Sequence, residues 1–256
     1  MKNDFIKEFW DNQANYFKTS HSASWGDKFA IDLEIENISK YIKEGSNVLD
    51  VGCANGYSTF RQLETKLNHI TGIDFSEPMI RYANEQKKEA GIKNIDFFIG
   101  DIRNIQYADD SFDMTYTTRV LINLPNWQEQ IKGIEECLRV TKRGGIVIFS
   151  EAFYEPLVLL NTLRALKYLS PLEEHDFNRY LKKKKLENYL SERNYKFEMV
   201  DFSSVYYLGS RFLRDLVTKI DDYPGYTNPI NKIFYEIEKD FSGGGFGIQA
   251  AYIIEK

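Results

Sequence analysis

The chain has 256 residues, 43% of them hydrophobic and 28% charged, and its 33 basic and 38 acidic residues give a net charge of -5. This composition is typical of one globular domain and excludes a fibrous or disordered chain. With no overall positive field, we expect no nucleic-acid partner. No apolar stretch approaches the roughly 20 residues of a membrane span, and the first residues lack the apolar segment of a signal peptide. We therefore expect a cytoplasmic protein without a membrane partner.

The chain offers little for disulfide or metal chemistry. It has two cysteines, Cys53 and Cys137, and three histidines, His21, His69 and His175. These residues are not paired at the spacing of structural zinc ligands, and a core of this size needs no disulfide framework. We expect two reduced, buried cysteines and no metal site.

Apolar runs of strand length alternate with segments of helical period over the first 150 residues, which predicts an open parallel sheet of βαβ units. In chain order we expect strand 47–51, helix 57–67, strand 69–74, helix 79–90, strand 95–99, strand 112–117, helix 127–140 and strand 145–150. The helix at 57–67 has Phe60, Leu63 and Leu67 on one face.

Beyond residue 151 the expected elements are a helix at 178–193, a strand at 195–207 and a terminal strand at 249–255. Two polar and aromatic segments, 152–177 and 208–241, lie between these elements, and we expect them to form lids. With an N-terminal helical cap at 1–44 and a core at 45–151, the pattern favours a single domain, 1–256, with insertions.

A glycine loop follows the first expected strand. Residues 50–56 read DVGCANG, an acidic residue followed by G-x-x-x-G, and such glycines let a ligand approach backbone amides closely. Ala54 and Tyr57 stand where a dinucleotide fingerprint requires glycine, and the phosphate loop ending in Gly-Lys-Ser/Thr is absent. Asp74 ends the second expected strand about 20 residues further on, which is the spacing of a ribose-binding carboxylate.

This combination resembles motif I and the acidic second strand of the class I S-adenosylmethionine (SAM) methyltransferases. The segments 100–102, 111–125 and 138–145 are similar to that family's later motifs, in the same order, so the resemblance covers residues 45–151. It implies an α/β fold, a Rossmann-like doubly wound seven-stranded sheet of order 3-2-1-4-5-7-6 with the last strand antiparallel. It also implies S-adenosyl-L-methionine as the cofactor and S-adenosyl-L-homocysteine (SAH) as its product.

The same resemblance implies a set of cofactor-binding residues. They are Asp50, Gly52 and Gly56 at the methionine part of SAM, Asp74 at the ribose, Phe75, Met79, Asp101 and Ile102 at the adenine, and Arg119 and Tyr16 at the methionine end. Tyr16 belongs to an aromatic N-terminal stretch that in many relatives folds over the SAM pocket. Packing within the core is the alternative for that stretch.

Methyl transfer from a sulfonium is an in-line displacement, in which the enzyme mainly aligns the acceptor and excludes water. A hydroxyl acceptor also needs a base, and the candidates are Asn123, Glu151, His175 and His21. The segment 171–180 around His175 resembles a stretch of the ubiquinone-biosynthesis O-methyltransferases. We assign catalytic roles to His175, Arg119 and His21, an exposed loop histidine being the alternative for His175. Residues 119–124 contain no carboxylate, so we expect no metal in catalysis.

The leading function is SAM-dependent methyl transfer to a small metabolite, on an oxygen of a sugar, a phosphorylated building block or a natural product, by a monomer or homodimer. One alternative is a macromolecule (protein or RNA) methyltransferase. The Asn/Asp-Pro-Pro-aromatic motif of nucleic-acid amino-methyltransferases belongs at the fourth strand, whereas 123–127 lies later and departs from it. A second alternative is a SAM-binding partner subunit without chemistry of its own.

Overall fold

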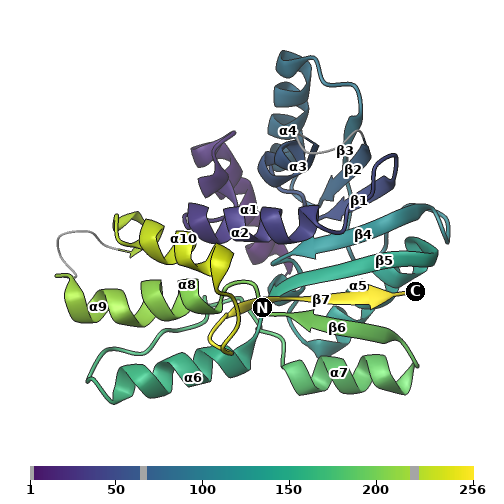
Figure 1. Cartoon of the computed structure of the whole chain (residues 1–256). Helices are drawn as coiled ribbons and strands as arrows, with labels where there is room; N and C mark the ends of the chain where they lie inside the picture. Colours follow the sequence, from purple (N-terminus) through teal and green to yellow (C-terminus); the bar gives the residue numbers. More distant parts are fainter. Residues whose placement is uncertain (1–2, 64–67, 220–224) are drawn as a thin grey trace.

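The computed structural model describes residues 3–63, 68–219 and 225–256 and contains a seven-stranded sheet with helices on both faces (Figure 1). The strands are β1 (Asn47–Val51), β2 (His69–Asp74), β3 (Ile95–Ile99), β4 (Phe112–Thr118), β5 (Thr141–Ala152), β6 (Lys196–Val200) and β7 (Gln249–Glu255). Their order is β3-β2-β1-β4-β5-β7-β6, and β7 is antiparallel to both neighbours. The predicted fold class and strand order are confirmed.

The α-helices form two layers around the sheet and a group at one end of it. They are α1 (Asn3–Phe17), α2 (Lys28–Ser39), α3 (Tyr57–Leu63), α4 (Glu77–Ala90), α5 (Trp127–Val140), α6 (Tyr154–Ala165), α7 (Lys183–Glu192), α8 (Ser204–Leu208), α9 (Arg214–Val217) and α10 (Asn231–Asp240). The short turns are η1 (His21–Ala23), η2 (Leu121–Asn123), the π-helical η3 (Gly209–Leu213) and η4 (Gly225–Thr227). Within the described residues, none of the helices combines the length and the apolar character needed to cross a membrane.

Two apolar cores lie on the two faces of the sheet. Side chains of α2, α3 and α4 pack into one core, and those of α5 and α7 pack into the other. Helices α1, α6, α8, α9 and α10 gather at the end where the parallel strands finish (Figure 1). In open α/β sheets ligands bind at this carboxyl end, so these helices surround the expected site.

The expected elements of the first 150 residues are present, with small shifts of their ends. Helix α4 begins at Glu77, two residues before the predicted start, because the Ser76 hydroxyl caps it by accepting the Met79 N–H. It ends as predicted before Gly91, which has φ 65°. Strand β5 is longer than predicted at both ends. Leu67, which was expected on the same helix face as Phe60 and Leu63, lies outside the described residues.

Two expectations for the second half are wrong. The predicted strand 195–207 ends as β6 at Val200, and Tyr206 and Tyr207 belong to α8. Both tyrosines are buried. In a strand, two adjacent side chains would point to opposite faces, whereas in α8 both are enclosed by neighbouring parts of the chain. The predicted helix 178–193 begins only at Lys183, because Leu181 makes a bridge to Phe153 in an extended conformation.

Candidate active site

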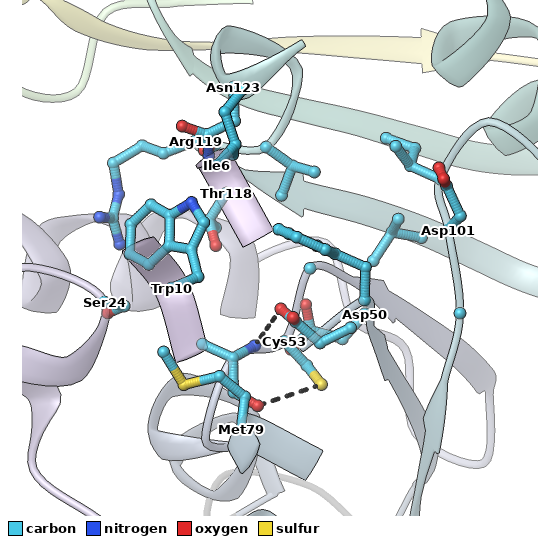
Figure 2. Close-up of a pocket in the computed structure, with 18 of the residues that line it drawn as sticks. Ile6, Trp10, Ser24, Asp50, Cys53, Met79, Asp101, Thr118, Arg119 and Asn123 are labelled. Atoms are coloured by element: carbon cyan, nitrogen blue, oxygen red, sulfur yellow. Dashed lines mark hydrogen bonds between the residues drawn. The ribbon is translucent and has the colours of Figure 1, made fainter. Parts of the chain in front are cut away.

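Two adjoining cavities lie at the carboxyl end of the parallel strands. The first has a volume of about 330 Å³ and the second about 550 Å³. Four residues line both cavities: Trp10, Ser24, Arg119 and Asn123. Figure 2 shows Ile6 and Trp10 of α1 among side chains from the ends of β1 and β4. Ligands in the two cavities would therefore lie next to each other, beside these four shared residues.

Asp74, at the end of β2, lines the first cavity with a fixed carboxylate. One oxygen accepts the N–H of Ala54 at 3.0 Å and the other accepts the N–H of Ser76 at 2.9 Å. Burial raises the pKa of Asp74 to about 6, although these two hydrogen bonds lower it. The carboxylate is thus oriented before any ligand arrives.

The glycine loop after β1 contributes Asp50 and Gly52 to the same cavity. Asp50 accepts a hydrogen bond from the Thr59 hydroxyl at 2.7 Å, and burial raises its pKa to about 6. Gly52 has φ 77°, and a Cβ there would lie 2.2 Å from the Val120 side chain. Gly56 does not line the cavity. A Cβ there would lie 2.8 Å from the Phe97 side chain, so this glycine allows the loop to pack closely.

The first cavity also has apolar lining residues of the kind expected around adenine. Phe75, Met79 and Ile102 line it, and Met79 is only 1% exposed. Asp101 also lines it but is held by hydrogen bonds from the Arg103 guanidinium. Burial raises the pKa of Asp101, and the hydrogen bonds from Arg103 outweigh this effect, so the pKa is lowered and the carboxylate stays charged.

Besides Gly56, two predicted site residues, Tyr16 and His21, line neither cavity. Tyr16 is 80% exposed, and its ring packs against Phe17. His21 has its Nδ1 3.1 Å from the Trp25 carbonyl oxygen, and its ring lies beside Tyr57. The placement of these two side chains gives no support for the roles predicted for them.

The second cavity has an aromatic wall drawn from three parts of the chain. Its aromatic residues are Phe9, Trp10, Phe17, Trp25, Phe177, Tyr180, Tyr207 and Tyr226. His175 lies among them, with its ring centre 5.4 Å from that of Phe9 and 4.5 Å from that of Phe177. Such a wall suits a flat, largely apolar ligand. The aromatic N-terminal stretch therefore contributes to a cavity as well as to packing.

Arg119 stands at the junction of the two cavities in a left-handed backbone conformation, with φ 58°. Its Nε donates to Glu34 at 3.1 Å, and its guanidinium lies 4.9 Å from the Trp25 ring centre. Glu34 is fully buried and also accepts from Gln249 Nε2 at 2.6 Å. Burial raises the pKa of Glu34 to about 7, and Arg119 acts in the opposite direction.

Sequence reasoning missed Glu34 and Gln249. Glu34 stands between Leu33 and Ile35, but Asp32 and Glu36 alternate with apolar residues in the same helix, so the sequence offered only a weak signal for Glu34. Gln249 gave no such signal, since it is a single polar residue at the start of a strand.

Glu151 proves to be a structural anchor rather than part of a cavity wall. Its carboxylate accepts the Thr117 hydroxyl at 2.7 Å and the N–H groups of Val120 and Leu121 at 3.1 Å each. Burial raises its pKa to about 7. These bonds fix the turn that carries Arg119 and Asn123. Of the four candidate bases, His175 and Asn123 line the second cavity.

The cysteines and the other possible metal ligands of the described residues form no cluster. Across residues 3–63, 68–219 and 225–256, no three His, Cys, Asp or Glu side chains are grouped so that they could hold a metal ion. Cys53 and Cys137 are free and buried, and burial raises the pKa of both thiols.

The sequence model of the methyltransferase domain family matches residues 42–194 of the chain. The chain belongs to the class I SAM-dependent methyltransferases. A demethylmenaquinone methyltransferase of Bacillus velezensis is 31% identical over 148 residues, covering 57% of this chain and 59% of that protein. One of Listeria welshimeri is 33% identical over 106 residues, covering 41% and 44%. The matches thus span about half the length of these relatives.

Solved structures share the fold of this methyltransferase at low sequence identity. A Haloferax volcanii methyltransferase, in complex with the Trm112 activator, has a TM-score of 0.64 at 16% identity and 96% coverage of both chains. Phosphoethanolamine N-methyltransferase 1 of Haemonchus contortus, bound to phosphoethanolamine and SAH, has a TM-score of 0.64 at 18% identity, covering 98% of this chain and 48% of that one. The [4+2]-cyclase SpnF has a TM-score of 0.59 at 21% identity, with 88% and 81% coverage.

Proposed function

We propose that the protein transfers the methyl group of SAM to a small molecule that binds in the second cavity. The observation that carries this proposal is the contact between the two cavities. One is lined by carboxylates from the strand ends, and the other is lined by aromatic rings. A donor in the first cavity and an acceptor in the second would meet beside Arg119 and Asn123, which line both cavities, and such direct contact is what in-line transfer requires.

The first cavity fits SAM in size and in chemistry. Its volume of about 330 Å³ lies within the range of ligand pockets. We propose that Asp74 holds the ribose hydroxyls, that Asp50 and the Gly52 loop bind the methionine part, and that Phe75 and Met79 enclose the adenine. SAM supplies the activated methyl group when it is bound. The residues of this chain bind it, orient it and exclude water.

For the acceptor, the aromatic wall favours a flat ring, and we propose that this ring carries a nucleophilic oxygen whose proton is taken by His175, which lines the same cavity. The relatives' name offers demethylmenaquinone as one molecule to test, in its reduced diol form, because the oxidised quinone has no nucleophile for the methyl group. The size of the second cavity supports a small acceptor over a macromolecule. Because a cyclase shares this fold, turnover has to be measured directly.

Binding of SAH tests the assignment of the first cavity. Asp74→Asn removes a charged acceptor of two hydroxyl hydrogen bonds, so SAH should bind at least about tenfold more weakly than to the unchanged protein. Isothermal calorimetry measures this. Asp113→Asn is the matched control, because Asp113 lies at the opposite end of β4 and pairs with Lys142, and SAH affinity should not change. Equal SAH affinity in the Asp74 variant, or tight binding of NAD, would contradict the proposal.

Transfer of label from methyl-labelled SAM tests the reaction itself. The acceptors to compare are demethylmenaquinone, ring-hydroxylated aromatics, sugars and a phosphorylated amine. We expect label in a ring-bearing acceptor. SAH binding without transfer to any of them would favour the SAM-binding partner subunit instead.

A further inference from the structure

We infer that the acceptor presents at least two hydroxyl or N–H donors to one side of the second cavity. This inference rests on the proposed function, since it describes the molecule that occupies the acceptor cavity. The side in question is a polar strip formed by Asn123, Arg119 and Gln249, all of which line that cavity. Eight aromatic side chains also line this cavity, together with polar residues such as Gln13, Ser22 and Glu173. The strip is the polar group whose members are linked to one another by hydrogen bonds, directly or through Glu34, so we infer that a ring's polar substituents are recognised there.

A continuous chain of hydrogen bonds holds the polar strip together. Asn123 Nδ2 donates to the Arg119 carbonyl oxygen at 2.9 Å, and Arg119 Nε donates to Glu34 Oε1 at 3.1 Å. Gln249 Nε2 donates to the same Glu34 oxygen at 2.6 Å. Glu34 is 1% exposed and touches neither cavity, so it acts as a positioning residue for Arg119 and Gln249.

These bonds also determine which atom of each amide is left over. Both amide nitrogens already donate, to a carbonyl and to a carboxylate, so each remaining atom is a carbonyl oxygen. Asn123 Oδ1 and Gln249 Oε1 are buried and have no hydrogen-bond partner among the described residues. An unsatisfied buried acceptor is unfavourable, and a donor on a ligand would remove this cost.

The position of Gln249 in the sheet strengthens this reading. As the first residue of the antiparallel strand β7, it lies at the carboxyl edge of the parallel strands, opposite Ala152 of β5. Asn178 lines the same cavity and has a third buried oxygen without a partner among the described residues. Surplus acceptors on a cavity wall select hydroxyl-bearing ligands, because an ether or carbonyl would leave the same oxygens unpaired.

Two ligands that share a ring and differ in donors test the inference. 1,4-Dihydroxynaphthalene has two donors, and 1,4-dimethoxynaphthalene has none. Calorimetry on SAH-saturated protein in anaerobic buffer should show at least tenfold tighter binding of the diol. In Gln249→Met, which keeps the side-chain length without the amide, this preference should fall about threefold or more, while the affinity for the diether stays the same.

Asn123→Ala gives an independent measurement and should reduce the same preference, so the test survives if one variant does not fold. SAH affinity reports folding in each variant. Asn231→Leu is the matched control, because Asn231 also has a buried oxygen without a partner in the described part of the chain but lines neither cavity. Its diol preference should match that of the unchanged protein.

The two proposals fail in different ways. If the unchanged protein binds SAH but binds diol and diether equally, the inference about donors is overturned and the proposed function stands. If the preference persists undiminished in both strip variants, the polar strip is not its source and the inference is also overturned. If SAH does not bind at all, the proposed function itself fails.

Discussion

His175 is the residue whose two roles the structure allows us to separate. Its imidazole is exposed in a loop and packs against the rings of Phe9 and Phe177, which also contact each other, on the wall of the acceptor cavity. It can therefore serve as a base or as part of an aromatic wall. With a hydroxyl acceptor, His175→Ala should lower kcat by about 100-fold or more, because general base catalysis contributes on this scale. SAH affinity should not change. Steady-state kinetics at saturating acceptor, over a range of pH, measures the effect.

His175→Phe is the informative control, since it keeps a ring in the stack and removes the proton acceptor. A base predicts that the phenylalanine variant is as impaired as the alanine variant. If His175→Phe restores turnover, the side chain acts only through packing. Full activity in both variants would place proton removal elsewhere.

At the level of single residues, the sequence was most informative where a role depends on position along the chain. Asp50 and Asp74 lie at strand ends and Gly52 directly follows one, at a defined spacing, and all three line the first cavity. Glu34 and Gln249 lie 215 residues apart and meet through one hydrogen bond. No local pattern predicts such a pairing, because it arises from how α2 and β7 pack. The exposed position of Tyr16 was not predictable for the same reason, since the orientation of α1 decides which of its aromatic side chains face inward.

At the level of elements, one buried ion pair joins the N-terminus of α2 to the π-helical turn η3. Asp27 is fully buried and accepts hydrogen bonds from the Ala30 N–H, the Tyr206 hydroxyl and the Arg211 guanidinium. Arg211 also lies over the rings of Tyr207 and Tyr226, which line the acceptor cavity. The pair therefore fixes the helices that carry part of the acceptor wall.

Removal of one partner should expose how much this junction contributes. Asp27→Asn leaves Arg211 buried without its counter-charge, so we expect the free energy of unfolding to fall by about 3–5 kcal/mol. Urea denaturation measures it. Lys132→Ala is the control, because Lys132 pairs with Glu129 at the surface and the loss should be below about 1 kcal/mol. A loss in Asp27→Asn no larger than that in the control would contradict the argument.

The limits of sequence reasoning at this scale follow from the same packing. Up to residue 152 most strand residues are buried and each strand overlaps its predicted range, so local pattern and tertiary structure agree. In the segment 195–208 they disagree, because tyrosines with high strand propensity form α8 instead. Tyr206 shows why: its hydroxyl donates to Asp27 at 2.6 Å, a contact across 179 positions that only the folded chain provides.

For the molecule as a whole, the distribution of charge follows from the position of the site. The net charge is -5, yet seven carboxyl groups of the described residues are buried, and two of them, Asp27 and Asp32, pair with arginines. The other five are Glu34, Asp50, Asp74, Glu151 and Glu238. Four of these five lie in or directly beside the two cavities or the turn that supports them, and Glu238 lies elsewhere, where it accepts the Tyr206 N–H of α8. Burial raises the pKa of each of these five to between about 6 and about 7.

These raised pKa values predict how stability depends on pH. In the unfolded chain the same carboxyls titrate near their ordinary values, about 4, so between pH 5 and pH 7 the folded state binds more protons than the unfolded state. The free energy of unfolding must then decrease as pH rises through this interval. Below about pH 4 the sign reverses, because ion pairs lower the pKa of surface carboxyls such as Asp96, Asp113 and Glu136.

Urea denaturation of the SAH-free protein at pH 5.5 and at pH 8.0 measures this dependence, and we expect greater stability at pH 5.5. Glu238→Gln removes one titrating group outside the cavities, so it should reduce the difference between the two pH values. Glu135→Gln is the control, since Glu135 is a surface residue that accepts a hydrogen bond from the Tyr189 hydroxyl, and it should leave the difference unchanged. Stability that rises from pH 5.5 to pH 8.0 would show that these carboxyls stay charged in the folded protein, and that the groups around the site offset the cost of burying them.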